Sequence, residues 1–130
     1  MSQDDKIKGT AMTANTTDRE LLELAAKAAG VAFDPEKSKP HLVSGAFWGL
    51  WLRIKGEPYE GQRRYWNPLT DDGDALRLAV KLRIRVANMS PRACAFTGLQ
   101  EFWEPEGDDA CKATRRAIVR AAAEIGKAMP

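Results

Sequence analysis

Three separate stretches of this sequence carry a helix-start signal followed by a helical repeat of apolar residues, and their spacing constrains the fold more than any other feature. In the first, the Thr17 hydroxyl is placed to cap the amide of Glu20, while Glu20 reaches back to the amide of Thr17. The second is the acidic run Asp71–Asp74, and the third is a cap at Asp108 or Asp109. We therefore expect three helices, over about 18–29, over about 71–83 and from the third cap to about residue 128.

The segments between these helices have the composition of strands. Residues 42–54 are rich in aromatic and β-branched side chains, are interrupted by Gly45 and Gly49, and are apolar on both alternating faces. We expect one strand there, with a bulge at one of the two glycines and an antiparallel return over 62–66. Two more strands are expected over 83–87 and 93–103, with a turn over 88–92. A strand that is apolar on both faces is either central in a layered fold or carries an exposed aromatic patch.

These elements predict an α+β fold. In it, about three helices pack on one antiparallel or mixed sheet of about four strands, as an α-β-α layered sandwich. The helical repeats also predict the buried side chains. In the second helix these are Leu76, Leu78, Ala79, Val80 and Leu82, and in the third they are Ala110, Ala113, Ala117, Ile118, Ala121, Ala122, Ile125 and Met129.

The length of 130 residues fits one domain. Residues 1–16 are polar, lack an apolar repeat and are expected to be a disordered lead-in, which leaves 17–130 as a single domain. The first residues resemble no secretory signal, and no apolar run approaches the length of about 18 that a membrane span needs. We expect a cytoplasmic protein with no membrane partner.

Most common catalytic chemistry lacks the necessary residues. The chain has one histidine and two cysteines, Cys94 and Cys111, which do not form a CxxC pair and are expected to be reduced and packed as small apolar side chains. The carboxylates of Asp71, Asp72 and Asp74 form an alternative site for a metal ion or for acid–base catalysis, but carboxylates at a helix start ordinarily serve as caps. We predict no enzymatic activity, no cofactor and no metal.

Three strings of this sequence resemble the phage ABA sandwich domain family, which comprises small proteins of phages and prophages. The strings are residues 19–30, 66–82 and 113–129. The resemblance implies an α-β-α layered fold, a viral accessory role and residence in the host cytoplasm, and it implies no particular activity. Residues 31–65 and 84–107 fall outside these strings, so we expect any specialised surface to lie there.

Aromatic side chains in these divergent segments are the first candidates for a binding surface, since aromatic and arginine residues are the usual anchors of protein interfaces. The alternative for them is ordinary packing within the sheet. The candidates are Phe47, Trp51, Tyr59, Phe102 and Trp103.

Basic side chains of the third helix form a second candidate surface. Lys112, Arg116 and Arg120 recur every four residues, with Arg115 and Lys127 beside them. A second basic set mixes guanidinium and aromatic groups, as nucleic-acid surfaces do, and consists of Arg77, Lys81, Arg83 and Arg85 with Arg63 and Arg64 beside Tyr65 and Trp66. Such a stripe either contacts phosphates or an acidic protein, or it is simply a solvated helix face. The net charge of +2, from 20 basic and 18 acidic residues, excludes a uniformly basic protein but not a local basic patch.

The sequence thus predicts a phage- or prophage-encoded, non-enzymatic accessory protein that binds a host protein or protein complex. A counter-defence inhibitor such as an anti-CRISPR protein is the specific form we expect. The alternative is a nucleic-acid-binding accessory protein that uses the basic face of the C-terminal helix. A homodimer is compatible with either.

Overall fold

The structure is a computed structural model, and it describes residues 17–40, 43–53, 65–98 and 100–130. These residues form three helices and two three-stranded antiparallel sheets, an α+β fold. The helices are α2 (Asp18–Ala29), α3 (Asp72–Leu82) and α4 (Ala110–Ala128). The first sheet has the order β1 (Phe33–Asp34), β2 (Leu50–Leu52), β3 (Tyr65–Trp66). The second has the order β4 (Arg85–Met89), β5 (Arg92–Thr97), β6 (Gln100–Pro105).

All three predicted helix starts are confirmed. The side chain of Thr17 accepts a hydrogen bond from the amide of Glu20, Asp71 accepts one from Asp74, and Asp109 accepts one from Lys112. Each bond satisfies an amide that the first turn of a helix leaves without an intrahelical partner. The helix ends also match the expected ranges to within one or two residues.

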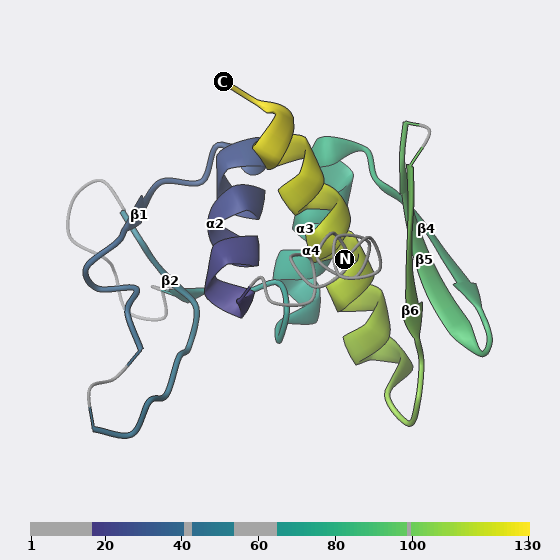
Figure 1. Cartoon of the computed structure of the whole chain (residues 1–130), viewed down its shortest axis with the longest axis horizontal. Helices are drawn as coiled ribbons and strands as arrows, with labels where there is room; N and C mark the ends of the chain where they lie inside the picture. The colour runs from purple at the N-terminus through teal and green to yellow at the C-terminus, as the bar shows by residue number, and fades with distance from the viewer. Residues whose placement is uncertain (1–16, 41–42, 54–64, 99) are drawn as a thin grey trace, which may run out of the picture.

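The layers differ from the expected α-β-α sandwich. Figure 1 shows the three helices in the middle of the molecule, with β1 and β2 beside α2 on one side and β4, β5 and β6 beside α4 on the other. The predicted single sheet of about four strands is therefore wrong, because the strand-like segments on either side of α3 form two separate sheets. One cluster of buried residues nevertheless runs through the molecule, from Leu50 and Trp66 through the helices to Ala95.

The alanine-rich face of α4 allows a very close helix–helix contact. Gly126 lies so near α2 that an added Cβ would be 2.0 Å from the carbonyl oxygen of Leu24. Ala121, Ala122 and Ala123 are also buried along α4. Since side chains this small let backbones approach, the small residues of α4 serve its packing on α2 as well as its packing on the sheet.

The strand predicted over 42–54 is mostly irregular in its described part. Residues 43–49 are not in a strand, and β2 covers only Leu50–Leu52. Gly49 has a φ of +123°, and a Cβ there would lie 2.6 Å from the carbonyl oxygen of Trp66. The backbone therefore bends at Gly49, where only glycine fits, and strand pairing begins after it. The antiparallel return is confirmed for Tyr65 and Trp66, which pair with Trp51 and Leu50, while 62–64 lie outside the described residues.

The strand predicted over 93–103 is two strands. β5 and β6 form a hairpin that reverses at Gly98, and the register pairs Thr97 with Gln100 and Arg92 with Pro105. β4 begins and ends two residues later than predicted, at 85–89 instead of 83–87, because α3 ends only at Leu82 and Arg83 forms its C-cap. It pairs with β5 around the turn at Ser90 and Pro91. The second sheet is consequently longer and more regular than the first.

Four side chains predicted to be buried are exposed. Leu76 and Val80 are 64% and 69% exposed, because the buried arc of α3 is centred on Ala75, Leu78 and Ala79 and these two residues lie outside it. Ala110 lies in the exposed first turn of α4, and Met129 follows its last turn. In the described part of the chain, no helix combines the length and the apolar character that crossing a membrane would require.

Candidate functional site

The second sheet has one covered and one open face. In an antiparallel sheet, directly paired residues share a face, and successive residues alternate between faces. The row Val86, Ala95 and Phe102 therefore lies on the same side as the row Asn88, Ala93 and Glu104. This is the side of α4, since Asn88 and Glu104 both bond to side chains of that helix. No described helix or strand packs on the other side (Figure 1).

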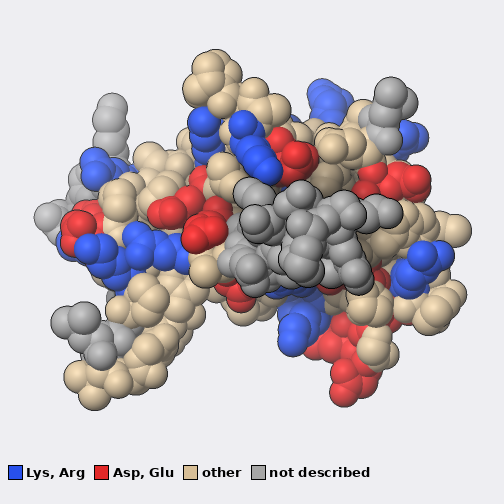
Figure 2. All heavy atoms as spheres, in the orientation of Figure 1, with Lys and Arg blue, Asp and Glu red and all other residues tan. Residues whose placement is uncertain are grey.

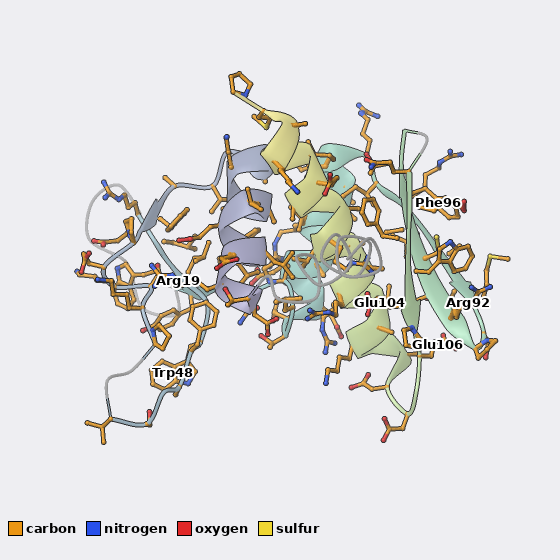
Figure 3. All side chains as sticks on the ribbon, in the orientation of Figure 1. Arg19, Trp48, Arg92, Phe96, Glu104 and Glu106 are labelled. Atoms are coloured by element: carbon orange, nitrogen blue, oxygen red, sulfur yellow. The ribbon has the colours of Figure 1, made fainter. Side chains whose placement is uncertain are left out.

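The open face carries an ordered group of aromatic, arginine and methionine side chains, which we call the outer patch. The guanidinium of Arg92 lies 4.4 Å from the centroid of the Trp103 ring, and that of Arg85 lies 6.0 Å from the centroid of the Phe96 ring. The two rings meet edge to face at 6.4 Å. Figure 3 shows Phe96 and Arg92 on the side away from α4 and Glu104 on the side toward it. The members of the outer patch are Arg85, Met89, Arg92, Phe96 and Trp103.

Cys94 lies beneath this layer, where it is completely buried between its cross-strand partners Ala87 and Trp103. Burial raises the pKa of the Cys94 thiol, since the thiolate would lose its hydration there. Cys94 is thus packed as a small apolar side chain, as predicted. Cys111 is exposed on α4, so the same expectation is wrong for it.

The predicted basic stripe of α4 is largely occupied by partners within the protein. Arg115 donates to Asp72 at 2.7 Å and to the carbonyl oxygen of Leu69 at 2.8 Å. Arg116 pairs with Asp18 at 3.1 Å, and Arg120 donates to Glu104 and, at 3.1 Å, to the carbonyl oxygen of Trp103. These three guanidinium groups hold α4 to the rest of the fold and are poorly placed to bind phosphate.

The other predicted basic residues do not extend the stripe into a broad surface. Lys112 is exposed at the start of α4, and Lys127 is exposed in its last turn. Arg63 and Arg64 lie outside the described residues. Figure 2 shows basic and acidic side chains interspersed over the visible face, with no extended field of one sign.

The five predicted aromatic anchors do not form one surface. Phe47 is half-buried against the core, and Trp51 packs edge to face on Tyr65 at 5.1 Å beside the first sheet. Phe102 points to the covered face of the second sheet, where Arg120 lies 5.7 Å from its centroid. Tyr59 lies outside the described residues, so among the described candidates Trp103 alone belongs to the outer patch.

The acidic cluster at the start of α3 is built into the fold. Asp71 caps α3, Asp72 pairs with Arg115, and Asp74 is 5% exposed. Asp74 accepts hydrogen bonds from the amide of Asn67 at 2.9 Å and from Arg77 at 2.8 Å. Over the described ranges, no group of three or more His, Cys, Asp or Glu residues is arranged to hold a metal ion.

A cavity of about 300 Å³ opens between α3, β4 and α4. Its lining is mostly apolar, with Leu76, Ala79, Val86 and Ile118 among the contributing side chains, and the ion pair of Asp72 and Arg115 borders it. It lies on the covered side of the second sheet, next to the edge strand β4. The outer patch and this cavity are therefore separate surfaces.

Sequence reasoning named Arg85 only as a basic residue and missed three members of the outer patch, namely Met89, Arg92 and Phe96. The sequence does indicate that part of this patch lies on one face of a strand, since Arg92, Cys94 and Phe96 alternate with small residues. The alternation becomes informative only once Gly98 is recognised as the hairpin turn, because the hairpin sets Trp103 beside Cys94.

No protein-family model, curated protein or solved structure matches the chain. The resemblance to the phage family stays a prediction.

Proposed function

We propose that this protein is a non-enzymatic binding module that attaches to a partner protein through its outer patch. The observation that carries the proposal is the open sheet face on which Trp103 and Phe96 each lie beneath an arginine. Tryptophan, arginine and methionine are enriched at protein interfaces, and arginine and tryptophan dominate their binding energy. The partner surface that fits is apolar at its centre, to receive Trp103 and Met89, with carboxylates placed to meet Arg85 and Arg92.

A protein fits this surface better than a nucleic acid does. Base stacking needs a free ring face, whereas Arg92 and Arg85 already lie over the rings of Trp103 and Phe96. The patch offers two cations, and the register places Glu101 beside Phe96 on the same face. Since the arginines of α4 are paired with carboxylates, they add little to a phosphate-binding surface.

The biological setting we propose is that of a phage or prophage accessory protein that acts in the host cytoplasm. Support for this setting comes from the resemblance of residues 19–30, 66–82 and 113–129 to the phage ABA sandwich domain family. A protein that covers a surface of a host defence complex, as an anti-CRISPR protein does, needs a rigid recognition face and no catalytic group. The outer patch on an antiparallel sheet meets that requirement.

Quantitative capture from a host lysate tests the proposal. The wild-type protein, Arg92→Glu and Lys112→Glu are each used as bait, and the recovered proteins are compared by mass spectrometry. Both substitutions reverse one exposed charge, but only Arg92 belongs to the outer patch, so Lys112→Glu is the matched control. We expect a specific protein that wild type and Lys112→Glu recover equally and that Arg92→Glu loses.

Three results would count against this function. The first is capture that Arg92→Glu leaves unchanged, and the second is loss of capture in Lys112→Glu alone. The third is recovery of nucleic acid with an affinity that falls steeply as salt is raised, which would favour the basic face of α4 instead.

A further inference from the structure

The outer edge of β4 is open. β4 lies at one end of the order β4-β5-β6, and within the described ranges no strand pairs with its other edge. Its residues Arg85, Val86, Asn88 and Met89 are exposed, and Ala87 is half-buried. An edge strand presents unpaired amide and carbonyl groups, which form a template for another strand.

Apolar side chains are exposed beside this open edge. Leu76 and Val80 on α3 are 64% and 69% exposed, and Val86 on β4 is 40% exposed. Leu76 and Val86 line the same cavity between α3, β4 and α4, so helix and strand form one continuous surface. We call this surface, made by Leu76, Val80 and β4, the α3–β4 flank. Exposed apolar patches of this kind on an ordered surface ordinarily mark an interface.

The charged residues on one face of α3 are arranged to complement the same face of a second, antiparallel α3. Asp72, Leu76, Val80 and Arg83 recur at spacings of four, four and three, so they follow one face of the helix. The acidic end of this face comes first and the basic end last. Asp72 pairs with Arg115 of its own copy, but its side chain remains 72% exposed. When two copies of α3 lie antiparallel, Leu76 of each meets Val80 of the other, and Asp72 of each approaches Arg83 of the other. A second copy of this chain therefore matches the flank in both charge and apolar contact.

The sequence of β4 also suits pairing with itself. In an antiparallel pair centred on Ala87, each Arg85 lies opposite Met89 of the second copy, and each Val86 lies opposite Asn88. No arginine faces an arginine, and all five residues of the strand are paired. This register avoids the like-charge contact that destabilises directly opposed residues.

We propose that two copies of this protein associate through the α3–β4 flank, with β4 paired to β4 around Ala87 and α3 packed antiparallel on α3. The contact is symmetric, since the same surface serves both copies. It joins the two second sheets into one sheet of six strands. The two outer patches then form one continuous face, because Arg85 of each copy lies beside Met89 of the other.

Molecular mass in solution gives the first test. Sedimentation equilibrium of the full chain at increasing concentration should show a dimer that Val80→Glu abolishes. The control is Val43→Glu, which places the same charge at another exposed valine, 91% exposed and far from α3 in sequence. We expect Val43→Glu to dimerise as wild type does, and circular dichroism should show that both variants keep their helices. A monomer at every concentration, or equal dimerisation of both variants, overturns the proposal.

Cysteine cross-linking tests the register. Cys94, the cross-strand partner of Ala87 in the same chain, is replaced by alanine and Cys111 by serine. In this background, Ala87→Cys places the thiols of the two copies directly opposite each other, at a Cβ–Cβ separation of about 4.5–5.5 Å. Oxidised glutathione then accepts two electrons and two protons and leaves one disulfide between the copies. Met89→Cys is the matched control, because the two introduced thiols are offset by four residues, roughly 13 Å along the strands. Disulfide-linked dimers of Ala87→Cys alone are expected, and equal cross-linking of both variants, or none in either, contradicts the register.

The proposed dimer and the proposed function can be tested independently, because different variants disrupt them. Val80 is remote from the open sheet face, so Val80→Glu should make the protein monomeric and leave each outer patch intact. If Val80→Glu is monomeric and still captures the partner, both proposals hold. If Arg92→Glu dimerises and captures nothing, the dimer is independent of partner binding.

Discussion

The guanidinium of Arg92 lies 4.4 Å from the centroid of the Trp103 ring, on the side of the second sheet that faces away from α4. The pair joins neighbouring strands, since Arg92 is on β5 and Trp103 is on β6. A cation over a ring holds both side chains in one orientation before any partner arrives. This ordering lowers the entropy that binding would otherwise cost. The pair is thus the centre of the proposed recognition surface.

The carboxylate of Glu104 should be important for stability. Glu104 lies on the covered face of β6, where Arg120 and Arg116 both approach it from α4. Replacing Glu104 with Gln leaves the partly buried guanidinium of Arg120 without its charge partner and leaves Arg116 with Asp18 alone, so we expect the free energy of unfolding to fall by about 1–3 kcal/mol. Urea unfolding measures the difference.

Glu101→Gln is the matched control for this change. Glu101 is on the same strand but on the open face, where it is exposed. Its substitution should change the free energy of unfolding by less than about 0.5 kcal/mol. Equal effects of Glu104→Gln and Glu101→Gln would contradict the importance of the contact between α4 and β6.

The crossing of α2 and α4 depends on Gly126. An added Cβ would lie 2.0 Å from the carbonyl oxygen of Leu24, and this oxygen cannot move away without its helix. Gly126→Ala should therefore destabilise the protein by about 3 kcal/mol, the upper end of typical over-packing. Thermal unfolding measures the change.

Gly73→Ala is the matched control, because it makes the same substitution in α3, away from the crossing of α2 and α4. A Cβ at Gly73 meets the flexible end of Arg77, at 3.1 Å, and the side-chain carboxylate of Asp71, at 3.2 Å, and its nearest contacts include no backbone atom of another helix. Because alanine favours helices over glycine by roughly 0.5–1 kcal/mol, Gly73→Ala should be neutral or stabilising. A small effect of Gly126→Ala, comparable with that of Gly73→Ala, would show that the helices are further apart than described.

The helices could be predicted from the sequence because their signals are local. Thr17 and Glu20 lie three residues apart, and so do Asp109 and Lys112, so the capping bonds can be read from short strings. The cap of α3 could be predicted for the same reason, since Asp71 lies three residues before Asp74, from whose amide its side chain accepts a hydrogen bond. Local signals do not specify which side of a helix is covered. Leu76 and Val80 match the apolar repeat of α3 and are nevertheless exposed.

The sheets and the candidate site could not be predicted because they depend on contacts between distant residues. The strand around Leu50 is short because Gly49 closely approaches the backbone of Trp66, seventeen positions away in the chain. Arg116 and Arg120 form a basic stripe on the helix itself, and only the fold brings Asp18 and Glu104 to them. The outer patch likewise exists only once the hairpin sets Trp103 beside Cys94.

Stability should depend on the Cys94 thiol at alkaline pH. Burial raises the pKa of Cys94 above its ordinary value of 9.0, so the folded state retains the thiol proton that the unfolded state releases. The free energy of unfolding is then unaffected by this group below pH 9.0 and falls as pH rises through the folded pKa. Urea unfolding at about pH 7 and about pH 10 should show a larger loss for wild type than for Cys94→Ala. Equal losses would mean that the thiol ionises as readily in the folded protein.

The most direct test of the proposed function is the affinity of the captured partner for the outer patch. Isothermal titration with the purified partner should give a Kd that Trp103→Ala and Arg92→Glu each raise at least about tenfold, since central tryptophan and arginine anchors contribute more than about 1.4 kcal/mol each. Lys112→Glu should leave the Kd unchanged within about twofold. An unchanged Kd in folded Arg92→Glu and Trp103→Ala would contradict binding through the open face of the second sheet.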